Sequence, residues 1–131
     1  MENFKKSLSV MSTGKFKLEY DEEYDNLFIY DLVKRASYGV EWGALDLSYD
    51  QRGNLVALAF NNASDFLTNL TNKKVTKETL KKVNNCRLNI LEKTGILYIT
   101  FTLYFKEKQL TPIKDTLTVK ALNFKSPISC A

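Results

Sequence analysis

The side chains most able to do chemistry form an acidic segment at residues 21–25, which contains Asp21, Glu22, Glu23 and Asp25. Carboxylates bind hard cations, and a pair of them can act as acid and base. The segment lacks the alternating oxygen spacing and the central glycine of a calcium loop. Short acidic side chains are also typical of turns, where they accept hydrogen bonds from nearby backbone amides. We therefore expect a solvated turn and predict no metal site; Asp21, Glu22 and Asp25 are the candidates for one.

The sequence contains no histidine. This absence removes the usual general base near neutral pH, the commonest zinc ligand and every nucleophile pair that depends on histidine. Gly39 and Gly43 lack the spacing of a phosphate-binding loop. We predict no catalytic residue and no cofactor, and the residues favour a protein that is not an enzyme. A metal-assisted hydrolase built on the acidic turn 21–25 is the second alternative function.

A lysine-rich segment at 73–82 is the main candidate for binding a polyanion. Four of its side chains are the candidates for nucleic-acid contact: Lys73, Lys74, Lys77 and Lys81. The segment has neither arginine, which recognises phosphate through its planar guanidinium, nor aromatic side chains that stack on bases. We expect an exposed helix face on which Glu78 pairs with Lys74 and Lys82. Weak nucleic-acid binding through this helix is the first alternative function.

Three aromatic side chains are candidates for a protein interface: Trp42, Tyr98 and Tyr104. Side chains alternate along a strand, so Tyr98 and Tyr104 share one face of an expected strand at 96–106, whereas Phe101 lies on the other. The edge of this long strand is a second candidate, because an unpaired edge can add a strand from another chain. The leading prediction is a non-enzymatic interaction module that self-associates, as a homo-oligomer, or binds a protein partner through a β edge or an aromatic sheet face.

Composition restricts the class of protein further. The chain has 131 residues, of which 44% are hydrophobic, enough for one domain with a packed core. The longest wholly apolar run, residues 55–60, is too short to cross a bilayer, and no secretory signal is recognisable. Cys86 and Cys130 match no zinc pattern, and two isolated thiols are typical of a reducing compartment. We expect a cytoplasmic protein without membrane contact.

Periodicity predicts the elements that position these residues. Strands are expected at 16–20, 27–32, 38–47 and 55–60, helices at 63–70 and 76–83, and further strands at 87–91, 96–106 and 113–122. The strand 38–47 contains Gly43, where we expect a bend. The predicted fold class is α+β: two antiparallel β-meander units, of about four and three strands, are joined by two central helices and packed as one domain.

The two predicted β units resemble each other. Shifting the sequence by 70 residues aligns Lys17 with Arg87, Leu27 with Leu97, Phe28 with Tyr98, and Ile29 with Ile99. The chain is therefore predicted to consist of a flexible N-terminal arm (1–14), a single α+β domain (15–124) with an internal pseudo-repeat (16–61 and 86–123), and a C-terminal tail (125–131).

Several short sequence blocks between residues 16 and 64 stand in a characteristic order. They are Tyr20-Asp21-x-x-x-Asp25-x-Leu27-x-Ile29, Gly39-Val-Glu41, Leu45-Asp46-Leu47-x-Tyr49-Asp50-x-x-Gly53-Asn54-Leu55-Val56 and Asn62-Ala63-Ser64. In these blocks the chain resembles a DUF2283-like family of uncharacterised bacterial and archaeal proteins, a domain of unknown function. The resemblance covers a little over a third of the chain. It implies a β-rich fold with a trailing helix, and it supplies no activity and no catalytic residue.

Overall fold

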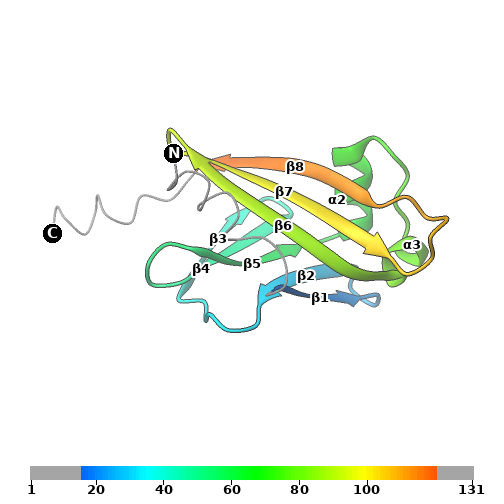
Figure 1. Cartoon of the computed structure of the whole chain (residues 1–131), viewed down its shortest axis with the longest axis horizontal. Coiled ribbons are helices and arrows are strands. Elements are labelled where there is room, and N and C mark those ends of the chain that lie inside the picture. Colours follow the sequence, from blue (N-terminus) through cyan, green and yellow to red (C-terminus); the bar gives the residue numbers. More distant parts are fainter. Residues whose placement is uncertain (1–15, 121–131) are drawn as a thin grey trace, which may run out of the picture.

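The computed structural model describes residues 16–120, which form two antiparallel β-sheets packed in two layers, with two short helices at one end (Figure 1). The chain completes the first sheet, passes through both helices and then forms the second sheet. The fold is thus mostly β, and it agrees with the α+β prediction in this coarse sense. The predicted arm 1–14 and tail 125–131 lie outside the described residues.

The first sheet has five strands. They are β1 (Phe16–Asp21), β2 (Asn26–Asp31), β3 (Tyr38–Trp42), β4 (Leu45–Tyr49) and β5 (Leu55–Phe60), in the order β1-β2-β5-β4-β3. The predicted four-stranded meander is wrong in two respects. The expected strand 38–47 is a hairpin, because Gly43 adopts a φ of 60° and turns the chain back after Trp42. In addition, β5 lies between β2 and β4, so β3 forms the far edge of the sheet.

The two helices are α2 (Ala63–Thr71) and α3 (Lys77–Lys81). The expected apolar stripe of α2 is present: Ala63 and Leu67 are buried, and Phe66 and Leu70 pack against the core. Helix α3 is shorter than the predicted 76–83, because the chain is already extended at Val83, where the next strand begins. Neither helix is long and apolar enough to cross a membrane.

The second sheet is a three-stranded meander. Its strands are β6 (Val83–Lys93), β7 (Ile96–Phe105) and β8 (Ile113–Lys120), in sequence order. The prediction that the long strand at 96–106 offers a free edge is wrong. Strand β7 is the centre of the sheet, hydrogen-bonded to β6 on one side and to β8 on the other. The sheet edges in the described part of the chain belong to β1, β3, β6 and β8.

The inward side chains of both sheets and of both helices form one apolar cluster. Phe60 of β5 and Phe101 of β7 are fully buried, and their ring centroids lie 5.5 Å apart across the interface between the layers. Phe60 also contacts Phe66 of α2, with a centroid distance of 5.4 Å. These three rings join the two sheets and the helix at a single point.

Both segments related by the 70-residue shift are β-hairpins whose corresponding side chains face inward. Leu27 and Ile29 are buried in the first hairpin, and Leu97 and Ile99 are buried in the second. The loops differ: four residues separate the paired ends of β1 and β2, whereas two residues separate those of β6 and β7. The cross-strand register is therefore shifted by two residues. The internal pseudo-repeat stays a prediction.

Replacing Phe101 by alanine should lower the free energy of unfolding by about 3–5 kcal/mol, because it leaves a cavity where the two layers and α2 meet. Urea denaturation followed by tryptophan fluorescence and by circular dichroism measures the loss. Trp42 is in the first sheet, so a fluorescence transition that F101A leaves unchanged would contradict a core shared by the two sheets. The conservative variant F101L should lose less than half as much.

Candidate interaction faces

The acidic turn between β1 and β2 contains one buried carboxylate, that of Asp25. Its Oδ1 accepts a hydrogen bond from the Tyr20 hydroxyl at 2.6 Å, and its Oδ2 accepts one from the Ser64 hydroxyl, also at 2.6 Å. The Ser64 backbone amide lies 3.2 Å from both oxygens. The backbone carbonyl of Asp25 accepts from the Ala63 amide at 2.7 Å. Asp25 therefore binds the first two amides of α2, although it lies 39 residues before Ser64.

Asn62 occupies the N-cap position of this helix, but its side chain makes no capping hydrogen bond and its backbone is left-handed, with a φ of 51°. The carboxylate of Asp25 fulfils the capping role instead. A negative charge at a helix N-terminus is favourable because the unpaired amides carry partial positive charge. Tyr20 and Asp25 belong to one block of the family resemblance and Ser64 to another, and the three side chains meet at one place.

The network shifts the pKa values of its members in opposite directions. Burial by itself raises the pKa of the Asp25 carboxyl, but hydrogen bonds from Ser64 and Tyr20, together with the positive charge of Lys77, outweigh it and hold the pKa below its usual value. The pKa of the Tyr20 hydroxyl is raised, first by burial and then by the hydrogen bond to Asp25. Asp25 is therefore ionised and Tyr20 protonated at neutral pH.

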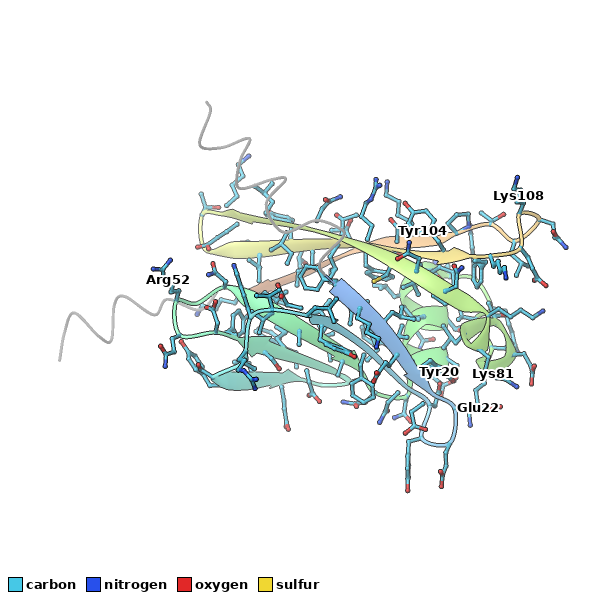
Figure 2. All side chains as sticks on the ribbon, turned by 60° about the horizontal axis from the view of Figure 1, so that its bottom comes forward. Tyr20, Glu22, Arg52, Lys81, Tyr104 and Lys108 are labelled. Atoms are coloured by element: carbon cyan, nitrogen blue, oxygen red, sulfur yellow. The ribbon has the colours of Figure 1, made fainter. Side chains whose placement is uncertain are left out.

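The other carboxylates of the turn do not point at the same spot. Asp21 accepts a hydrogen bond from the backbone amide of Glu23 at 3.0 Å, as in a turn that an aspartate stabilises. Glu22 forms an exposed ion pair with Lys81 at 3.4 Å, close to Tyr20 (Figure 2). Between residues 16 and 120, no group of three or more potential ligands could hold a metal ion. The geometry gives no support to the hydrolase that was the second alternative function.

The lysine-rich segment is divided into paired and unpaired side chains. Lys81 pairs with Glu22 and, at 3.7 Å, with Glu78, whereas the expected partners of Glu78 were Lys74 and Lys82. Lys82 approaches Glu107 at 3.9 Å. The candidates Lys73, Lys74, Lys77 and Lys81 therefore do not form one free cationic surface. Lys73 and Lys74 lie in the connection between α2 and α3 and form no ion pair with a described residue.

The aromatic candidates lie on two different sheets. Trp42 is on the edge strand β3 and is 42% exposed. Tyr98 and Tyr104 are half-buried on β7 and face away from the core, opposite to the buried Phe101, as predicted. Figure 2 shows Tyr104 on the three-stranded sheet. The structure brings Tyr98 and Tyr104 to one face and leaves Trp42 apart from them.

The outward face of the three-stranded sheet, which we call the basic face, carries four cations and no carboxylate. Its residues occupy alternate positions of β6, β7 and β8: Asn85, Arg87, Asn89, Leu91, Lys93, Ile96, Tyr98, Thr100, Thr102, Tyr104, Lys114, Thr116, Thr118 and Lys120. The register sets Thr102 between Arg87 and Lys114, and Ile96 between Lys93 and Lys120. The four cations were not recognised in the sequence, although the alternation of the strands could have identified them.

The outward face of the five-stranded sheet, which we call the acidic face, has the opposite charge. Its residues are Lys17, Glu19, Asp21, Asn26, Phe28, Tyr30, Gly39, Glu41, Asp46, Ser48, Ala57 and Ala59. Four carboxylates thus face outward with a single lysine. Glu41 and Asp46 are direct cross-strand neighbours, an unfavourable arrangement for like charges. Asp46 accepts a hydrogen bond from the side-chain amide of Asn61 at 3.1 Å.

A hollow of about 440 Å³ lies in the centre of the acidic face. Its base consists of the small side chains of Ala57, Ala59 and Ser48, and Phe28, which is 36% exposed, stands at its side. The Tyr30 hydroxyl donates a hydrogen bond to the carboxylate of Glu19, on the neighbouring strand β1, at 2.9 Å. The hollow therefore combines an apolar base with a negatively charged border.

The thiol of Cys86 is buried in the core, and burial raises its pKa to about 11. It therefore stays protonated at neutral pH and behaves as a small apolar side chain. Cys130 lies outside the described residues.

Comparison with protein-family models, with curated proteins and with solved structures gives no match to this chain. The family resemblance of residues 16–64 stays a prediction.

Replacing Asp25 by asparagine should lower the free energy of unfolding at pH 7 by about 1–3 kcal/mol, since a buried charge-assisted network loses its charge. The pKa of Asp25 is lowered by folding, so its contribution is complete above the unfolded pKa of about 3.9 and is lost as the pH falls through the folded value. Urea denaturation should show that the difference in stability between D25N and wild type becomes smaller as the pH falls below the unfolded pKa of about 3.9.

The matched control is E23Q, which removes the charge of an exposed residue in the same turn and should change stability little at either pH. A loss for D25N that is equally large at pH 7 and at pH 3 would show that the charge of Asp25 does not carry the effect.

Proposed function

We propose that this protein is a non-enzymatic interaction module that self-associates by binding its basic face to the acidic face of a second copy. The observation that carries the proposal is the segregation of charge: four cations without a carboxylate on one outward sheet face, and four carboxylates with one lysine on the other. Complementary charge accelerates association and fixes which surfaces meet.

Charge repulsion within each face favours an oppositely charged partner. Glu41 and Asp46 are adjacent on β3 and β4, and a cation from another molecule would relieve their repulsion. On the basic face, Arg87 and Lys114 occupy the same cross-strand row, on either side of Thr102. All four cations of this face are exposed. They are therefore accessible to a partner.

Apolar groups on both faces complement the charges. The basic face presents Tyr98, Tyr104 and Ile96, of which Ile96 is 37% exposed. The acidic face presents Phe28 beside the hollow over Ala57. Aromatic side chains that fill a pocket commonly supply most of the binding energy of an interface, with charges around them.

A contact between two different faces has a consequence for the assembly. Each bound copy still has one free basic face and one free acidic face, so that association continues until a ring closes or an open chain forms. The expected product is a series of oligomers that grows with protein concentration. Added salt should shorten it, because salt screens exposed charges over about 10 Å at 0.1 M ionic strength.

Two variants that each weaken one face test this arrangement. R87E/K120E replaces two of the four cations of the basic face by carboxylates, and E41K replaces one of the four carboxylates of the acidic face by a cation. Each variant alone should be monomeric, but an equimolar mixture should form a 1:1 heterodimer, because each variant retains the face that is weakened in the other. Analytical ultracentrifugation at low salt measures both results.

The matched control for R87E/K120E is K34E/K108E, which changes the net charge equally at loop positions outside both faces. It should associate like wild type. A wild-type protein that is monomeric at every concentration in low salt, or a mixture of the two face variants that stays monomeric, would refute the proposal.

Single-stranded nucleic acid is a second candidate partner of the basic face. Tyr98 and Tyr104 could stack on bases, and Arg87 with Lys114 could neutralise phosphates. Fluorescence anisotropy with a labelled single-stranded oligonucleotide should then show binding that Y98A and R87E weaken and that salt reduces. Binding weakened instead by K77Q would locate the site on the lysine-rich segment, and affinity indifferent to salt would exclude this function.

A further inference from the structure

A second recess lies at the end of the molecule where the helices meet the second sheet. It has a volume of about 420 Å³ and opens between the α2–α3 connection and the start of β8. Apart from Lys114 it shares no residue with the basic face, and it shares none with the acidic face. The recess therefore meets the proposed oligomer interface only at Lys114.

The floor of this recess is apolar. Val75 is buried beneath it, and Phe105, Leu110 and Ile113 are half-buried around it. Pro112 adds a rigid apolar surface at the entrance, and it also prevents the backbone there from donating a hydrogen bond. A ligand would need an apolar body to cover this floor.

The rim of the recess is cationic. Lys73 and Lys74 line it from the α2–α3 connection, and Lys114 lines it from β8. None of these three forms an ion pair with a described residue, in contrast to Lys81 and Lys82. The one carboxylate of the rim, Asp115, accepts a hydrogen bond from the Thr116 amide at 2.7 Å. The rim therefore has an excess of positive charge that the described residues leave unneutralised.

The hydroxyl groups of the recess are already largely engaged. Thr71 Oγ1 donates to the Leu67 carbonyl at 2.7 Å, and the Thr79 hydroxyl lies 3.0 Å from that of Thr76. These bonds lie at the two ends of the α2–α3 connection. They also leave the lysine ammonium groups as the main donors available to a ligand.

We infer that this recess binds a small amphiphilic anion, with its apolar body on the floor and its anionic group beside Lys73, Lys74 and Lys114. The volume is within the range of about 300–1,000 Å³ that is usual for ligand sites. An inorganic anion would leave the floor uncovered, and a neutral apolar molecule would leave the three ammonium groups unpaired. Both parts of the ligand are needed.

Three probes separate these contributions in a calorimetric titration. Naphthalene-1-sulfonate carries both an aromatic body and a charge, naphthalene-1-sulfonamide keeps the body without the charge, and inorganic sulfate keeps the charge without the body. We expect measurable binding of the first and binding at least fivefold weaker for the other two. Equal affinity for the sulfonamide or for sulfate would overturn the inference, as would the absence of heat with naphthalene-1-sulfonate at millimolar concentration.

Variants locate the site. K73Q/K74Q should weaken the binding of naphthalene-1-sulfonate about five- to thirtyfold, since each exposed charge contact contributes a modest factor. The matched control K81Q/K82Q removes two charges from the same segment outside the recess and should bind normally. Unchanged binding by K73Q/K74Q would refute the site. The R87E/K120E variant should not self-associate, and neither substitution lies in the recess. Binding of naphthalene-1-sulfonate to this variant therefore tests the recess independently of self-association.

Discussion

The carboxylate of Asp25 connects the β1–β2 turn to Ser64 at the start of α2, 39 residues further along the chain. It accepts hydrogen bonds from the Tyr20 hydroxyl and from the hydroxyl and backbone amide of Ser64, and the backbone carbonyl of Asp25 accepts one from the Ala63 amide. At 7% exposure, this charge is stable only because every partner donates to it. The start of α2 is therefore fixed relative to the first sheet. The helix in turn presents Phe66 to Phe60, and through it to the second sheet.

Local patterns in the sequence identified most elements but not their neighbours in space. Alternation located the strand around Leu18, a continuous apolar run located the strand around Leu58, and the predicted helix at 63–70 was correct. Gly43 was interpreted as a bend because a missing side chain permits both a bend and a reversal, and only its left-handed backbone distinguishes them. The position of β5 between β2 and β4 is a long-range pairing, which no local pattern of residues encodes.

The candidate sites show the same limit. Asp21 could be interpreted correctly as a turn residue, because its hydrogen-bond partner is two residues away. The role of Asp25 depends on Ser64, and that of Lys81 on Glu22, contacts that only the folded chain creates. The charge segregation between the two sheet faces was different: it was present in the alternation of the strands, but it becomes apparent only when each strand is assigned to a sheet.

The β1–β2 and β6–β7 hairpins differ in loop length, and this difference has a consequence for how the architecture tolerates insertions and deletions. The loops contain four and two residues. The corresponding side chains of both hairpins nevertheless face inward, because the difference in loop length is an even number. Strand side chains repeat every two residues, so lengthening an arm by a pair of residues keeps apolar groups inside. A single residue inserted into a strand would turn the inward side chains of the rest of that strand outward. Insertions and deletions in the strands of these hairpins should therefore be tolerated when they add or remove two residues.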